Sequence, residues 1–211
     1  MPINSSLLRL WLFLAFACVT VEARAADDKT VIFFGDSLTA GLGLEDPAID
    51  AYPAVIQKKI TDARLPWRVV NAGLSGETTA GGLRRVDWIL RQQVDVFVLA
   101  LGGNDGLRGI DPALTRANLQ GIIDKVKARY PAAKIVLAGM MMPPSMGEDY
   151  ARAFRDLYPA LAEKNGIALV PFLLEGVGGS PELNQADGIH PTAKGHAMVA
   201  ETVWKVLKSL L

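Results

Sequence analysis

The sequence predicts an α/β protein with a five-stranded parallel sheet that helices cover on both faces. Short apolar runs rich in β-branched residues alternate along the chain with longer segments in which apolar residues recur at helical spacing. The strongest predicted strand, residues 94–101, has a single charged side chain, which is typical of a parallel strand buried on both faces. No internal repeat or linker interrupts the alternation, so we expect one domain after the N-terminal segment.

The first half of the chain predicts two strands and two helices. A strand is expected over 31–34, where four apolar residues precede a Gly-Asp-Ser turn. Apolar residues at helical spacing predict a helix over about 50–63, and a short strand follows over 68–71. Thr78 is of the residue type that caps helices, and the apolar pattern after it predicts a second helix.

The second half continues the same alternation. An Asp-Pro pair at 111–112 is a helix start signal, and Pro159 is expected to kink or split the helix that contains it. The predicted elements are a strand over 94–101, a helix over 112–130, a strand over 134–138, a helix over about 148–165, a strand over 167–170 and a final helix from about 191.

Residues 1–25 are interpreted as a secretory signal peptide. Arg9 precedes a ten-residue apolar run, and Ala23-Arg24-Ala25 has the small-x-small form of a cleavage site. The run is short for a transmembrane span, so an uncleaved anchor and a lipoprotein modified at Cys18 are the alternatives. Cleavage would leave a domain of residues 26–211 without cysteine, which we expect to be periplasmic or secreted and not inserted in a membrane.

Composition argues against a highly charged partner. The 211 residues include 22 basic and 22 acidic side chains, which are interspersed along the chain. A nucleic-acid or polybasic membrane surface would require a clustered basic excess. We therefore expect no nucleic-acid partner, and a monomer that acts on a small molecule.

Three residues have the chemistry of a nucleophilic triad. Ser37 follows the first predicted strand, where a strand-to-helix turn can expose its hydroxyl. His190 is a natural general base for that hydroxyl, and Asp187, three residues earlier, could orient the imidazole. Each also has a structural alternative, because Ser and Asp are common helix caps.

Two further turns could stabilise an oxyanion. The residues concerned are Gly73, whose lack of a Cβ allows close approach, and Asn104, whose side chain carries an NH2 group. The backbone N–H of Ser37 would be a third donor. All three residues follow predicted strands, and ligands of parallel sheets bind outside the carboxyl ends of the strands. An ordinary turn glycine and a loop asparagine are the alternatives.

Four segments together resemble the SGNH (GDSL) hydrolases: residues 35–38, the Gly73 turn, residues 102–105 and the 187–190 pair. Within that family the chain resembles the periplasmic thioesterase I, lysophospholipase and arylesterase branch. The resemblance implies a flavodoxin-like three-layer α/β/α sandwich, hydrolysis of esters and thioesters through an acyl-enzyme, and no cofactor. It also implies the triad and oxyanion roles given above.

The same resemblance places an acyl-binding groove around the site. Met142 and Pro143, in a methionine-rich segment, would form one wall of the groove. Leu107, Arg108 and Ile110 would form the opposite side. The methionines could equally be ordinary core residues.

Other candidates fit structural roles better. Asp36 and Asp105 lie in turns and are expected to accept hydrogen bonds from their own backbone rather than act as a catalytic pair. His196 is interpreted as a surface or packing residue. No grouping of His, Cys and carboxylates has the spacing of metal ligands.

Two other functions stay open at this point. A carbohydrate O-deacetylase could use the same scaffold, although the apolar Met-Pro segment is unlike a sugar-lined cleft. A non-catalytic flavodoxin-like module could bind a phosphate or nucleotide, but Asp36 would stand in the phosphate cradle and repel an anion.

Overall fold

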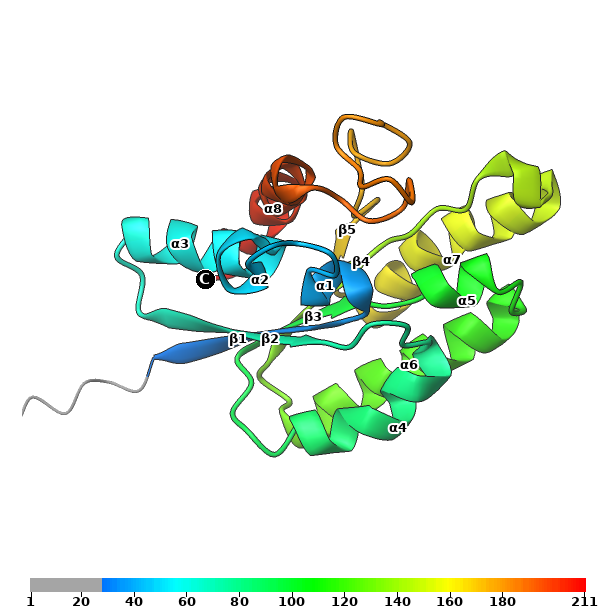
Figure 1. Cartoon of the computed structure of the whole chain (residues 1–211). Helices are drawn as coiled ribbons and strands as arrows, with labels where there is room; N and C mark the ends of the chain where they lie inside the picture. Colours follow the sequence, from blue (N-terminus) through cyan, green and yellow to red (C-terminus); the bar gives the residue numbers. More distant parts are fainter. Residues whose placement is uncertain (1–27) are drawn as a thin grey trace, which may run out of the picture.

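Five parallel strands form one sheet at the centre of the computed structural model, in the order β2-β1-β3-β4-β5 (Figure 1). The structure describes residues 28–211, so the expected signal peptide over 1–25 lies outside the described residues. No helix in the described part of the chain is both long enough and apolar enough to cross a membrane. The strands are β1 (Lys29–Gly35), β2 (Trp67–Gly73), β3 (Val96–Ala100), β4 (Lys134–Ala138) and β5 (Ala168–Val170).

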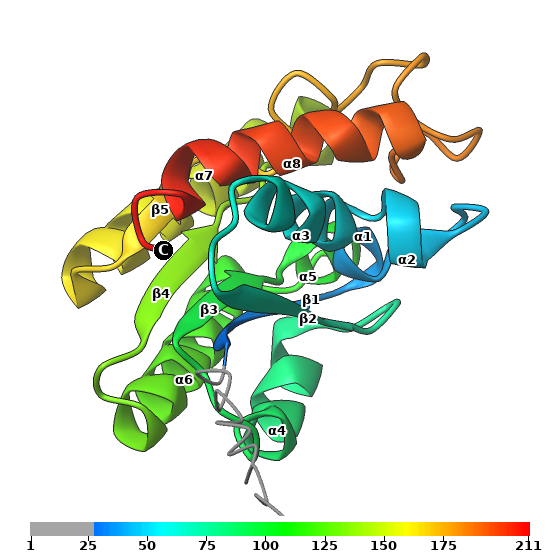
Figure 2. The same ribbon diagram turned by 90° about the vertical axis from the view of Figure 1, so that its left-hand side faces the viewer.

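Helices cover both faces of the sheet, which gives the three layers that the family resemblance implied. α3 and α8 pack together on one face, while α4, α6 and α7 pack side by side on the other (Figures 1 and 2). The helices are α1 (Ser37–Ala40), α2 (Pro47–Asp50), α3 (Tyr52–Asp62), α4 (Thr79–Ile89), α5 (Gly103–Leu107), α6 (Pro112–Arg129), the 3₁₀ turn η1 (Pro144–Met146), α7 (Glu148–Asn165) and α8 (Ala193–Leu207).

Local signals explain where most helices begin. Asp111 caps α6 by accepting a hydrogen bond from the Ala113 N–H at 2.8 Å, and Thr78 caps α4 through the Gly81 N–H at 3.3 Å. The helix predicted over about 50–63 is α3, and an additional short helix, α2, precedes it across Ala51, which has an extended backbone. Pro53 has no N–H and lies in the first turn of α3, where proline is tolerated, whereas in the interior of one longer helix it would remove a hydrogen bond.

Pro159 does not divide α7, so the split, one of the two predicted effects of this proline, does not occur. The helix runs unbroken over Glu148–Asn165, with Leu157, Tyr158 and Leu161 buried around the proline. Packing of these large side chains against the sheet offsets the hydrogen bond that a proline removes from the helix.

Two inner strands of the sheet, β1 and β3, are buried, and their carboxyl ends fix where the loops that follow them begin. Residues 31–34 of β1 are fully buried, as are residues 96–99 of β3. Gly35, the last residue of β1, pairs with Gly73 of β2 and with Ala100 of β3. The loops that follow these three strands therefore begin side by side at one edge of the sheet.

Candidate active site

The structure brings the three predicted triad residues into one hydrogen-bonded chain. Ser37 is the first residue of α1, and its Oγ lies 2.8 Å from His190 Nε2. The other ring nitrogen, Nδ1, lies 2.6 Å from Asp187 Oδ2. Ser37 and the His190 side chain are largely buried, whereas the Asp187 side chain is 46% exposed.

The chemistry of Asp187 sets the proton positions in this chain. A carboxylate can only accept hydrogen bonds, so Nδ1 carries the imidazole proton and Nε2 is free to accept the Ser37 hydroxyl proton. Hydrogen bonds from the His190 ring and from the N–H groups of His190 and Ile189 lower the pKa of Asp187 to about 2. Asp187 is therefore ionised throughout the pH range in which enzymes are usually assayed.

The loop between β5 and α8 holds the histidine and its carboxylate in one tight turn. Asp187 Oδ1 accepts hydrogen bonds from the N–H groups of Ile189 and His190, both at 3.0 Å. The Gln185 N–H donates to the His190 carbonyl at 2.7 Å. Gly188 has φ +73°, a conformation that favours glycine, so the turn can bring residues 187 and 190 together.

A cavity of about 570 Å³ opens over Ser37, and we call it the Ser37 cavity. Both Ser37 and His190 line it, so the hydroxyl and its base face the same space. Most of its remaining wall is apolar and comes from the loops after β3, β4 and β5. The apolar side chains include Leu107, Met141, Met142, Pro143, Phe172 and Leu174.

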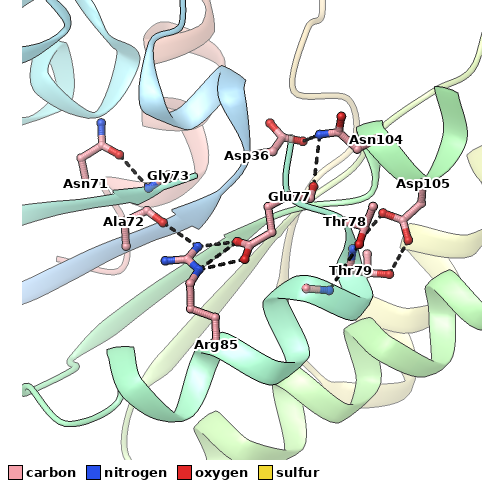
Figure 3. A network of polar contacts seen from close by, with 11 residues as sticks. Asp36, Asn71, Ala72, Gly73, Glu77, Thr78, Thr79, Arg85, Asn104 and Asp105 are labelled. Carbon is pink, nitrogen blue, oxygen red and sulfur yellow. Dashed lines mark hydrogen bonds and ion pairs between the residues drawn. The ribbon is translucent and has the colours of Figure 1, made fainter. Parts of the chain in front are cut away.

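Asn104 projects its side-chain amide toward the Ser37 cavity from the start of α5. Its Nδ2 donates a hydrogen bond to the Glu77 carbonyl at 3.1 Å and lies 3.4 Å from Asp36 Oδ2 (Figure 3). The amide is thus held between the loop after β1 and the loop after β2. Its orientation is fixed before any ligand binds.

The structure places Gly76, and not the predicted Gly73, on the cavity wall. Gly73 ends β2 and donates its N–H to Asn71 Oδ1 at 3.0 Å (Figure 3). It packs against α1, since a Cβ on Gly73 would lie 2.3 Å from the Ala40 nitrogen. Gly76 lines the Ser37 cavity and has φ +78°. The prediction that Gly73 faces the site is therefore wrong, and Gly76, three residues along the same loop, lines the cavity instead.

The carboxylates of Glu77 and Asp105 connect the loops after β2 and β3 to α4 (Figure 3). Glu77, whose side chain is 3% exposed, accepts a forked ion pair from Arg85 of α4. Asp105 is fully buried and accepts from the Thr79 N–H at 2.8 Å and from the Thr79 hydroxyl at 2.5 Å. Asp105 was expected to bond its own turn, and instead it connects α5 to the start of α4.

The predicted groove residues divide into two groups. Leu107, Met142 and Pro143 line the Ser37 cavity. Arg108 and Ile110 do not, because the chain turns away after α5, and the Arg108 Nη2 donates to the Gly76 carbonyl at 3.0 Å. Sequence reasoning also missed Phe172 and Leu174, although both follow a predicted strand, and the rule that ligands bind beyond strand ends could have found them.

His196, a second histidine near the site, is buried. His196 is 1% exposed, not at the surface, and its Nδ1 accepts the Tyr52 N–H at 3.3 Å. Burial lowers the pKa of His196 to about 4, so the ring is neutral near pH 7. Among residues 28–211, no three His, Cys, Asp or Glu side chains are grouped so that they could hold a metal ion.

Asp36 is a buried carboxylate next to Ser37. It is 3% exposed, and its Oδ1 accepts the Leu38 N–H at 3.0 Å, the backbone hydrogen bond expected from the sequence. Burial raises the pKa of Asp36 from 3.8 to about 6, against the opposing effect of that hydrogen bond. Keeping this carboxylate ionised therefore costs the folded state free energy.

This cost predicts a pH-dependent difference between the wild type and Asp36→Asn. The folded-state pKa is raised, so the contribution of protonated Asp36 is present below pH ~4 and is lost as the pH rises through about 6. Relative to the variant, the free energy of unfolding of the wild type should fall by about 3 kcal/mol between pH ~4 and ~7. Urea unfolding of both proteins at several pH values measures the difference between their free energies of unfolding. A difference that does not change with pH would contradict a raised pKa for Asp36.

Comparison with known proteins places this site in a family. Residues 33–198 match the GDSL-like Lipase/Acylhydrolase family. The chain is 43% identical to the esterase TesA of Pseudomonas aeruginosa, covering 94% of this chain and 96% of that protein. It is 38% identical to thioesterase 1/protease 1/lysophospholipase L1 of Escherichia coli, over 94% and 92% of the two chains. A crystal structure of TesA matches with a TM-score of 0.82 and 44% identity, over 87% of this chain and all of that one. The chain therefore belongs to the GDSL-like lipase/acylhydrolase family, as its sequence motifs predicted.

Proposed function

We propose that this protein is a serine hydrolase that cleaves carboxylic ester and thioester bonds through an acyl-enzyme. The observation that carries the proposal is the continuous chain from Ser37 through His190 to Asp187 on the wall of an apolar cavity. A nucleophile, its base and a group that orients the base are the elements that acyl transfer requires.

In the proposed reaction, Ser37 Oγ attacks the substrate carbonyl while His190 Nε2 takes the hydroxyl proton. Collapse of the tetrahedral intermediate breaks the bond to the leaving alcohol or thiol, which receives that proton from His190. Water then attacks the acyl-enzyme, giving one proton to His190, and release of the acid restores Ser37. Asp187 stays ionised and stabilises the imidazolium in both steps, consistent with its low pKa.

We assign the oxyanion donors to the N–H groups of Ser37 and Gly76 and to Nδ2 of Asn104. Support comes from the cavity, which all three residues line, and from the hydrogen bond of Asn104 Nδ2 to the Glu77 carbonyl, which holds the amide in place. The second N–H of Nδ2 has only the longer contact with Asp36 Oδ2, at 3.4 Å, and is the one assigned to the oxyanion. Donors that are oriented before the reaction need no reorganisation as charge develops on the carbonyl oxygen.

The apolar wall of the Ser37 cavity supports an acyl chain or aryl ring as the group that is bound. About 570 Å³ is in the range of small-molecule sites, and the wall is dominated by methionine, leucine and phenylalanine side chains. This lining disfavours a carbohydrate deacetylase. The names of the relatives, which are esterase, arylesterase and thioesterase 1/protease 1/lysophospholipase L1, support aryl esters, thioesters and lysophospholipids as substrate classes.

We further propose that the protein is exported and acts as a monomer of residues 26–211. The support is the apolar run behind Arg9 and the Ala23-Arg24-Ala25 sequence. N-terminal sequencing of protein recovered from the periplasm or medium should begin at or near Ala26. Retention of residues 1–25 on a membrane-bound form would refute the proposed cleavage.

Ser37→Ala should abolish ester hydrolysis with little change in thermal stability, because the hydroxyl supplies the nucleophile. A phosphonylating serine reagent should label the wild type at Ser37, as mass spectrometry of peptides can establish. Ser209→Ala, which changes an exposed serine at the other end of the chain, is the matched control. Residual activity above about a thousandth of the wild-type rate would show that the nucleophile is misassigned.

Asn104→Ala should lower kcat by about 100- to 1,000-fold with little change in KM, because an oxyanion donor acts mainly in the transition state. Steady-state kinetics on a p-nitrophenyl ester separates the two constants. A loss confined to KM would mean that Asn104 only holds the substrate, and the assignment would then be withdrawn.

A further inference from the structure

A second hollow of about 530 Å³ adjoins the Ser37 cavity, and Gly76 lines both. It is formed by the loop over 74–78 and the first turns of α4, together with three arginine side chains. These are Arg84, Arg85 and Arg108, so we call it the arginine hollow. The proposed mechanism uses none of the three.

One of the three arginines is neutralised within the fold. Arg85 Nε donates to both carboxylate oxygens of Glu77, at 2.9 and 3.1 Å, and its Nη2 donates to the Ala72 carbonyl. Its guanidinium also stacks on Phe34, 4.3 Å from the ring centroid. Arg85 is therefore a fixed wall of the hollow rather than a free charge.

The other two arginines keep their charge. Neither Arg84 nor Arg108 has an acidic partner within 4 Å among residues 28–211, and both are exposed. Arg108 Nη2 donates to the Gly76 carbonyl at 3.0 Å, which holds the side chain at the junction of the two hollows but leaves its charge uncompensated. Two positive charges thus lie on a hollow that shares Gly76 with the Ser37 cavity.

The two adjoining spaces have opposite chemistry. The Ser37 cavity is largely apolar, while the arginine hollow is polar and cationic. Guanidinium groups bind phosphate oxygens in a planar, forked geometry, and they keep their charge at every accessible pH. A substrate with an apolar acyl chain on one side of the scissile bond and a phosphate on the other would match both.

We propose that the arginine hollow binds the phosphate of the substrate's leaving group through Arg84 and Arg108. The inference rests on the proposed ester and thioester hydrolysis and names the class of alcohol or thiol that is released. Coenzyme A and the headgroup of a lysophospholipid share this chemistry. In either case the acyl chain stays on Ser37 in the apolar cavity while the phosphate-bearing product leaves through the hollow.

The test compares decanoyl substrates in pairs that differ in the phosphate of the leaving group. Decanoyl-CoA is paired with decanoyl-N-acetylcysteamine, and decanoyl lysophosphatidylglycerol with monodecanoylglycerol, all below their micelle concentrations. The quantity measured is kcat/KM for the phosphate-bearing substrate divided by kcat/KM for its phosphate-free partner. In R84Q/R108Q this ratio should fall about tenfold, as expected for the loss of two exposed charged contacts. R84E/R108E should lower the ratio further, and added salt should lower it in the wild type but not in R84Q/R108Q.

The pair whose ratio falls identifies the source of the phosphate, a thioester of coenzyme A or a lysophospholipid. The matched control is R68Q/R91Q, which removes two other exposed arginines that lie outside both hollows and have no acidic partner within 4 Å in the described chain. Its ratios should equal those of the wild type.

Two outcomes would overturn the phosphate site. Both ratios could be unchanged in R84Q/R108Q, even if the rates within each pair fall together, or the control R68Q/R91Q could lower the ratios as much. A wild type that hydrolyses none of the four substrates would instead refute the proposed function. The neutral substrates therefore separate failure of the phosphate site from failure of the catalytic assignment.

Discussion

The register of β1 with its two neighbours is the constraint on which the site depends. Gly35 pairs with Gly73 on one side and with Ala100 on the other, so three loops leave the sheet at the same level. Those loops carry Ser37, Gly76 and Asn104. Since every strand is parallel, each of these loops leads into a helix that returns across a face of the sheet. A slip in the register of β1 would move Ser37 away from both other loops.

Buried carboxylates then hold the loops in a single arrangement. Glu77 is paired with Arg85, and Asp105 with Thr79, so the loops after β2 and β3 are both anchored to α4 (Figure 3). A buried carboxylate is tolerated only when its oxygens are paired, so these interactions permit few alternative positions for the loops. Asp36 is less well compensated. Burial raises the pKa of Asp36, so keeping this carboxylate ionised beside Ser37 lowers the stability of the fold, as is common at functional sites.

Patterns local to the sequence predicted the fold class and the three residues that form the hydrogen-bonded chain from Ser37 to Asp187. The alternation of apolar runs with helical patterns predicted all five strands, because parallel strands buried on both faces must be apolar throughout. Ser37, Asp187 and His190 were found because each lies in a short motif whose chemistry can be read from a few residues. The helix boundaries at Asp111 and Thr78 also followed from local capping.

Only the tertiary structure decided which residues of each loop face the cavity. Gly73 and Gly76 are both glycines in one loop, and the choice between them depends on the path of the chain. The first is pressed against α1 with its N–H bonded to Asn71, while the second turns onto the cavity wall. Arg108 turns away from the Ser37 cavity for the same reason, and Phe172 lines that cavity from a distant loop. Side-chain direction in a loop is set by contacts between segments far apart in the chain, and no local pattern records those contacts.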